Sequence, residues 1–151
     1  MKVGIRSALA GDLAAVEEIE KRSFTEPWSK LNFQQSLFDP ACLFLVAEEE
    51  EKIIGYAIAW VVLDELHIGN LAVHPQRRNR GIGRRLLASL IGYGVEKGCR
   101  MATLELRESN QIALNLYLKE GFRPVALRKG YYQHPKEDAL VMIKEMGDGM
   151  V

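Results

Sequence analysis

The chain has 151 residues, of which 48% are hydrophobic and 26% are charged. This length suits one domain with its own core, so we expect a single domain over residues 1–151, and the composition excludes intrinsic disorder. Twenty basic residues balance twenty acidic ones, which excludes a generally basic protein that coats nucleic acid. No segment reaches the roughly 18 apolar residues of a membrane span, and the start lacks a signal-peptide pattern, so we expect a cytoplasmic protein without a membrane partner.

Apolar spacing predicts, in chain order, a strand, two helices, three strands, a helix, a strand, a helix and two strands. The expected strands lie at residues 3–6, 43–48, 53–63, 66–73, 101–106, 122–131 and 139–143. The expected helices begin after an Asp12 cap, at Ser29, at Gly83 and at Gln111, and the last one stops at Gly121. We expect a hairpin turn at 49–52, a loop at 132–137 and a frayed tail after Met146.

The helix at 83–97 joins two strands, and such a crossover places its strands side by side in one sheet. The order of elements therefore predicts an α/β fold with a mixed sheet. Ligands of open α/β sheets bind at the carboxyl ends of strands, and one basic, glycine-rich segment follows the strand at 66–73.

That segment carries the main functional signal. It runs Arg78-Asn79-Arg80-Gly81-Ile82-Gly83, after an apolar strand and before an amphipathic helix. Backbone N–H groups at a helix start are unpaired donors, and glycine lets a phosphate approach them closely. Five arginines lie within nine residues, at positions 77, 78, 80, 84 and 85. We therefore expect a ligand that carries a pyrophosphate, while a solvated basic face is the alternative for most of the arginines.

Other phosphate-binding patterns fit this segment less well. A Walker loop needs Lys and then Ser or Thr after its last glycine, but Arg84 and Arg85 follow Gly83, which excludes it. The dinucleotide fingerprint needs a third glycine where Leu86 stands. Aromatic residues do not interleave with the arginines, which argues against a nucleic-acid partner.

Two residues downstream of the loop suit acid–base chemistry. Glu105 alternates with Leu104 and Leu106 in a strand, so it points away from their apolar face. Tyr117 shares a helix face with Asn110, and a phenol is a poor base but a suitable proton donor. The alternatives are a structural Glu105 paired with Arg107 or another arginine, and a core tyrosine with its hydroxyl tied down.

Taken together, these motifs resemble a known family. Arg78-x-x-Gly81-x-Gly83 in this setting resembles the acyl-CoA loop of the Gcn5-related N-acetyltransferase (GNAT) superfamily. Glu105-x-Arg107-x-Ser109-Asn110-x-x-Ala113-x-x-Leu116-Tyr117-x-x-x-Gly121-Phe122 resembles the signature of the RimI-type ribosomal-protein N-terminal acetyltransferases. Residues 24–29 resemble their substrate-side loop, and residues 128–132 their loop after the sixth strand. The resemblance implies a mostly antiparallel sheet of about six or seven strands with about four helices.

The resemblance also assigns roles to residues. It implies that Glu105 is the base and Tyr117 the acid of a direct transfer from acetyl-CoA, the co-substrate. The implied acetyl-CoA contacts are Leu71, Ala72, Val73, Asn79, Arg80, Gly81, Ile82, Gly83, Arg84 and Asn110. The implied substrate-binding residues are Trp28, Tyr131 and Tyr132. At Gly69 the family often has a larger apolar residue, a departure that affects the shape of the acceptor site.

The implied partner is a protein N-terminus, with the N-terminal alanine of small-subunit ribosomal protein eighteen as the family's usual acceptor. The open alternatives are a small amine or a lysine side chain as acceptor, and a non-catalytic acyl-CoA-sensing module. No metal is expected, because His67, His74 and His134 lack ligand spacing. Cys42 and Cys99 lie far apart and have no histidine nearby, so we expect reduced thiols and no acyl-enzyme.

Overall fold

The computed structural model describes residues 2–146, so the predicted fraying of the tail after Met146 concerns residues outside this range. Two short 3-10 turns, Ala10–Asp12 and Pro75–Arg77, accompany the helices and strands. The helices are α1 (Leu13–Ser23), α2 (Lys30–Phe38), α3 (Ile82–Glu96) and α4 (Gln111–Lys119). The strands are β1 (Val3–Ser7), β2 (Cys42–Glu49), β3 (Lys52–Val62), β4 (Glu65–Val73), β5 (Met101–Arg107), β6 (Arg123–Gln133) and β7 (Lys136–Glu145).

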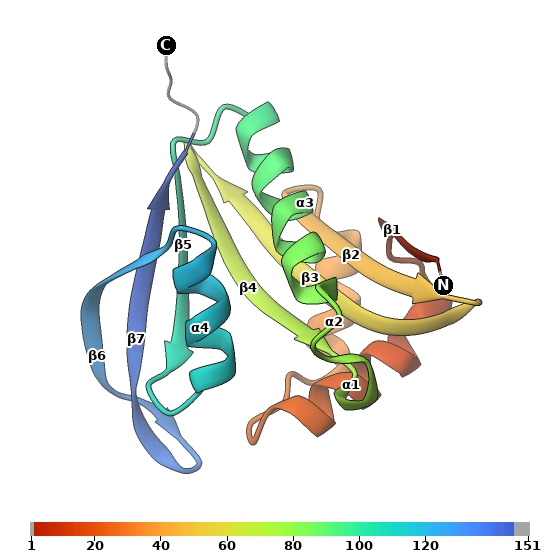
Figure 1. The fold of residues 1–151 in the computed structure, drawn as a ribbon, viewed down its shortest axis with the longest axis horizontal. Coiled ribbons are helices and arrows are strands. Elements are labelled where there is room, and N and C mark those ends of the chain that lie inside the picture. The colour runs from red at the N-terminus through yellow and green to blue at the C-terminus, as the bar shows by residue number, and fades with distance from the viewer. Residues whose placement is uncertain (1, 147–151) are drawn as a thin grey trace.

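All the strands form one sheet in the order β1-β2-β3-β4-β5-β7-β6 (Figure 1). Neighbouring strands are antiparallel except β4 and β5, which are parallel and joined through α3. The predicted element order, the mixed and mostly antiparallel sheet, and the crossover that brings two strands together are thus confirmed.

The sheet is covered on both faces, because successive side chains of a strand point to opposite sides. In β2, Phe44 and Val46 join one apolar cluster, which α1 and α2 cover with residues such as Val16 and Phe33. The intervening Leu45 and Ala47 join a second cluster, built by α3 and α4. Both clusters reach the middle of the sheet, so its central strands are held in place from both sides.

Two local details differ from the prediction, the capping role of Asp12 and the end of the strand before Leu63. Asp12 stands at the start of α1 but its side chain does not cap that helix. It instead accepts hydrogen bonds from the Leu9 N–H at 2.8 Å and from Arg6. Leu63, predicted within a strand, lies in the β3–β4 turn with φ of 57° and is 93% exposed.

The last hairpin also differs from the prediction. Its strands extend to Gln133 and Lys136, so the expected loop at 132–137 shrinks to two residues. Apolar spacing placed residues 128–131 in a strand, whereas the family resemblance implied a loop at 128–132; the segment lies inside β6, at an interruption of its pairing with β7. A bulged edge strand therefore supplies the residues that were expected from a loop.

None of the helices within residues 2–146 is both long and apolar enough to cross a membrane.

Candidate active site

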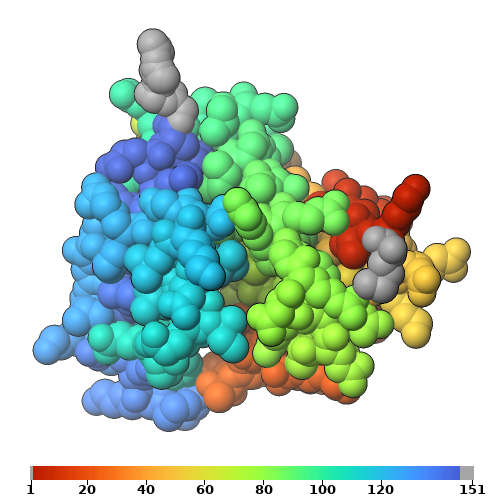
Figure 2. Space-filling model, in the orientation of Figure 1, coloured from red at the N-terminus to blue at the C-terminus, as the bar shows by residue number. Residues whose placement is uncertain are grey.

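The site lies where β4 and β5 separate. These strands pair only over Glu65–His67 and Met101–Thr103, although β4 continues to Val73 and β5 to Arg107. Beyond the paired segment their side chains line a cleft of about 440 Å³. Figure 2 shows the surface hollowed between the α4 side and the start of α3. The cleft-facing edge of β4 is consequently left without a neighbouring strand, and its backbone groups are open to a ligand.

The sequence-predicted residues of β4 lie along this edge. Leu71 lines the cleft, whereas the side chains of Ala72 and Val73 are buried and both residues pair with β3. The Val73 carbonyl also accepts a hydrogen bond from Arg78 Nε at 3.0 Å. An extended ligand could therefore pair with this stretch as an added strand would, although the Val73 carbonyl already accepts one hydrogen bond.

The glycine-rich loop connects the end of β4 to α3. Asn79 and Gly81 adopt positive φ values of 66° and 78°, and Gly81 is the N-cap. The first backbone hydrogen bond of the helix runs from the Arg85 N–H to the Gly81 carbonyl at 3.1 Å. The N–H groups of Ile82, Gly83 and Arg84 therefore precede the first acceptor of the helix, which makes this end suitable for a phosphate.

The arginines around this loop bind mostly to the protein itself. Arg77 pairs with the buried carboxylate of Glu49 at 2.9 Å, and Arg80 lies 3.7 Å from the same carboxylate. Arg84, at the helix start, pairs with Glu120 at 3.1 Å. The cluster is thus neither a bare solvated face nor a set of unengaged arginines, because Arg77, Arg80 and Arg84 all lie beside carboxylates of the protein.

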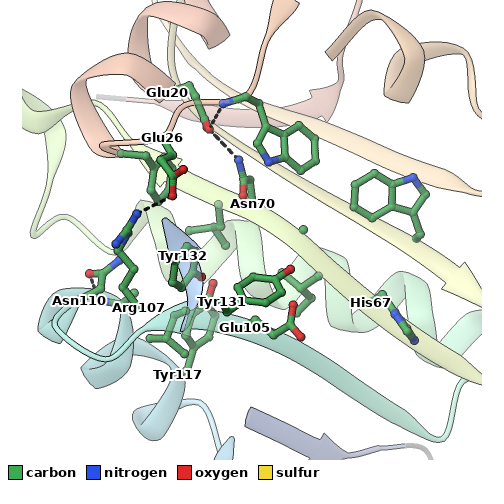
Figure 3. Close-up of a pocket in the computed structure, with 18 residues that line it drawn as sticks. Glu20, Glu26, His67, Asn70, Glu105, Arg107, Asn110, Tyr117, Tyr131 and Tyr132 are labelled. Carbon is green, nitrogen blue, oxygen red and sulfur yellow. Dashed lines mark hydrogen bonds and ion pairs between the residues drawn. The ribbon is translucent and has the colours of Figure 1, made fainter. Parts of the chain in front are cut away.

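Glu105 points into the cleft from β5, as its alternation with buried leucines predicted (Figure 3). Its side chain is 28% exposed and forms an ion pair with Arg128 of β6. The structural alternative of an arginine partner is therefore realised, although the partner is Arg128 and not Arg107. A carboxylate held in this way still faces the space between β4 and β5.

Tyr117 borders the same cleft from α4, on the side of the helix that also presents Asn110 and Ala113 to the cleft. It is 6% exposed and packs edge-on against Phe122 at 5.4 Å between ring centroids. Burial raises the pKa of the Tyr117 phenol above its usual range. Tyr117 belongs to the buried core, as the structural alternative expected, but its hydroxyl is not held by a hydrogen bond to another side chain or backbone group of residues 2–146. Such a phenol stays protonated and can donate its proton into the cleft.

Asn110 has a local task as well. Its side-chain oxygen accepts a hydrogen bond from the Ala113 N–H at 3.2 Å and so caps α4. Asn110 is also one of the residues that line the cleft. One side chain therefore fixes the helix that presents Tyr117 and borders the ligand space.

Arg107 ties the mouth of the cleft together. Its guanidinium pairs with Glu26, in the connection between α1 and α2, at 2.8 Å and with Glu137 of β7 at 3.2 Å. It also lies 4.3 Å from the centre of the Tyr132 ring, and Tyr131 packs edge-on against Tyr132. Burial raises the pKa of Tyr132 to about 12. The two predicted substrate-side tyrosines thus sit in one network with the connection between α1 and α2.

Sequence reasoning missed Glu20, which is 1% exposed and lies at the bottom of the cleft. Its carboxylate accepts hydrogen bonds from the Trp28 N–H at 2.8 Å, the Asn70 amide at 2.9 Å and the Tyr56 hydroxyl. Burial raises the pKa of this carboxyl. A signal was present, because position 20 lies seven residues after Leu13, on the apolar face of α1.

The third predicted substrate-side residue, Trp28, lies in the same connection between α1 and α2 and lines the cleft. Its ring packs against Trp60 of β3 at 5.7 Å and against Phe33 at 5.4 Å. Trp60, which the sequence did not single out, also lines the cleft. The structure therefore gathers Glu105, Tyr117 and all three predicted substrate-side residues around one space.

In the part of the chain that the structure describes, the histidines and cysteines offer neither a metal site nor a reactive thiol at the cleft. Within residues 2–146 no group of three or more His, Cys, Asp or Glu side chains could hold a metal ion. His67 lines the cleft and bonds to Glu65 at 2.8 Å. Burial raises the pKa of the Cys42 thiol to about 12 and raises that of Cys99, and neither borders the cleft, so both are unsuited to act as nucleophiles.

Comparison with known proteins agrees with this geometry. Residues 13–122 match the model of the acetyltransferase (GNAT) family. A Haemophilus influenzae protein named [ribosomal protein bS18]-alanine N-acetyltransferase is 40% identical over 88% of this chain and 92% of its own length. The crystal structure of the ribosomal-protein-S18-alanine N-acetyltransferase from Escherichia coli superposes with a TM-score of 0.89 at 33% identity, over 99% of this chain and 97% of that one. Arabidopsis thaliana NAA60 in complex with acetyl-CoA shares the fold, with a TM-score of 0.88 at 21% identity over 96% and 99% of the two chains.

Proposed function

Because the chain belongs to the acetyltransferase (GNAT) family, we propose that it transfers the acetyl group of acetyl-CoA to the α-amine of a protein N-terminus. One observation carries the proposal. A carboxylate, Glu105, and a protonated phenol, Tyr117, border the same cleft, which opens beside a helix start with unpaired N–H groups. These are the base, the acid and the anion site that acetyl transfer from a thioester to an amine requires.

The donor would lie along β4 and the start of α3. The N–H groups of Ile82, Gly83 and Arg84 suit the pyrophosphate, and the open edge of β4 at Leu71 suits the amide groups of an extended pantetheine arm. The thioester would then lie between the separated strands. This placement leaves the Trp28 and Tyr132 side of the cleft for the acceptor.

In the reaction we propose, the neutral amine attacks the thioester carbonyl carbon in a ternary complex. Glu105 accepts the proton that the amine nitrogen loses, directly or through water. The carbon–sulfur bond breaks, and Tyr117 gives its proton to the departing thiolate. The raised pKa of Tyr117 favours this role, because its phenol remains protonated until the thiolate forms. No acyl-enzyme is needed.

An N-terminal amine suits this machinery better than a lysine. The reference pKa of an N-terminal amine is about 8, against about 10.4 for a lysine side chain. Near pH 7 a much larger fraction of the N-terminal amine is therefore already neutral, and a modest base suffices. The name of the Haemophilus influenzae relative supports the N-terminal alanine of ribosomal protein bS18 as the acceptor. Because ribosomal proteins are made and assembled in the cytoplasm, we expect the protein to act there.

The test is a turnover assay with acetyl-CoA and peptides that begin with the acceptor sequence. Three acceptors separate the possibilities: a peptide with a free N-terminus and no lysine, its Nα-blocked version carrying one lysine, and a polyamine. We expect CoA release and an acetylated product with the first alone. Turnover only with the lysine peptide or the polyamine contradicts the proposed acceptor, and acetyl-CoA binding without turnover on any amine contradicts the enzyme.

A further inference from the structure

Gly69 occupies an unusual position in β4. It has no partner in the pairing of β3 with β4, since Ile58 pairs with Asn70 and Ala59 with Ile68. A Cβ atom at this position would stand 2.3 Å from one ring atom of Trp60 and 3.3 Å from the Trp28 ring. The Trp60 indole therefore fills the space that any side chain at position 69 would take.

The two indoles form a fixed unit. Their ring centroids lie 5.7 Å apart with an interplanar angle of 34°, and Trp28 also packs on the fully buried Phe33. The backbone of Trp28 is held by Glu20, whose carboxylate also holds Asn70, the neighbour of Gly69 (Figure 3). The pair is thus tied to the strand over which it lies.

The same pair separates two cavities. The main cleft, of about 440 Å³, lies on one side, and a cavity of about 240 Å³ lies on the other, bordered by polar residues of α2 such as Asn32 and Gln35. Trp28 and Trp60 line both. Removing one indole would therefore join the smaller cavity to the cleft.

From these observations we infer that Trp60, seated over Gly69 and backed by Trp28, sets the size limit for the first residue of the acceptor; the inference rests on the proposed function. In this proposal the amine lies at Glu105 of β5 and the side chain of its residue extends across the cleft, toward β4 and the indoles. A small side chain, as in alanine, glycine or serine, would then fit in front of the indoles. A longer one, as in methionine or leucine, would collide with the Trp60 ring.

The experiment uses lysine-free peptides that differ only in the first residue, Ala, Ser, Met or Leu, with acetyl-CoA. The full chain is expected to prefer Ala over Leu by at least tenfold in kcat/KM. Trp60→Ala is expected to shrink this ratio at least tenfold, through a gain on Met and Leu relative to Ala. Trp60→Leu, which retains more of the packing, should shift the ratio in the same direction. The matched control is Leu63→Ala, an exposed residue of the same hairpin, which should leave the ratio unchanged.

A second readout does not depend on activity. Gly69→Leu should lower the melting temperature because its side chain collides with the indole. Combining it with Trp60→Ala should recover the melting temperature and restore the preference for Ala, since the leucine refills the vacated space. An unchanged Ala-to-Leu ratio in both Trp60 variants, or the absence of recovery in the double variant, overturns the inference while leaving the proposed function intact. A full chain that turns over none of the peptides overturns both.

Discussion

The two ends of the cleft are built in different ways. The donor end, where we propose that acetyl-CoA binds, offers mainly backbone groups of one continuous stretch, the end of β4 and the start of α3. Its arginine side chains pair with carboxylates of the protein instead. The acceptor end uses side chains from distant parts of the chain, including Trp28, Trp60, Glu105 and Tyr132. We propose from this difference that the constant phosphate of the donor is held by backbone geometry, whereas the variable acceptor is selected by side chains that can be exchanged.

The largest effect should come from the acceptor end. Glu105→Gln should lower kcat/KM about a hundredfold or more, because a general base contributes on this scale, while the affinity for acetyl-CoA stays within twofold. Steady-state kinetics and calorimetric binding measure the two quantities. Arg128→Gln is the matched control, since it removes the same ion pair but keeps the carboxylate. Equal losses in the two variants would show that the ion pair matters and that Glu105 is no base.

Tyr117→Phe tests the group between the two ends. The ring contact with Phe122 is retained, so folding should be unaffected, whereas kcat should fall about tenfold or more because the thiolate leaves without a proton donor. The raised pKa of Tyr117 has a further consequence. The wild-type rate should show no loss from tyrosine ionisation as the pH rises to about 10, the reference pKa of a free phenol. An unchanged kcat in the phenylalanine variant would remove Tyr117 from the mechanism.

At the donor end, Gly83→Ala isolates the backbone contribution. A Cβ here meets its nearest protein atom at 3.6 Å, an ordinary contact, so the variant should fold and could gain up to about 1 kcal/mol from helix propensity. Its dissociation constant for acetyl-CoA should nevertheless rise about tenfold, because the methyl group blocks close approach to the helix start. Gly92→Ala, in the same helix with nothing within 4 Å, provides the control. Equal affinities in both variants would argue against phosphate binding at this turn.

The smallest effect on kinetics is expected far from both ends. Arg6 hydrogen-bonds to Asp12 and holds the pKa of that carboxyl below its usual range. The folded form is thus favoured above about pH 4, the unfolded reference, and this contribution is lost as the pH falls through the lower folded pKa. Asp12→Asn should cost about 1 kcal/mol of unfolding free energy at pH 7 and less at pH 3, with kcat/KM unchanged. Urea unfolding at the two pH values measures the difference; an equal cost at both would contradict the charge-based explanation.

Much of the donor end was predictable from the sequence. The strand, the glycines and the apolar face of α3 follow one another within about 30 positions, and each has a local signature. Pairs of side chains that meet in the cleft were harder to predict from the sequence. The sequence suggested an arginine partner for Glu105 but not Arg128, because which residue of β6 faces Glu105 depends on the register of β6 on β7, which is irregular between Arg128 and Tyr132.

By itself, the sequence determined the order of the elements and the phosphate-suited helix start, because these depend on short-range periodicity and on backbone conformation. Tertiary structure alone decided that Glu20 holds Trp28 and Asn70, that Arg107 links the connection between α1 and α2 to β7, and that Trp60 fills the space above Gly69. The physical reason is distance along the chain. These contacts join positions 8 to 81 residues apart, and which side chains meet there depends on how the strands separate and where they bulge.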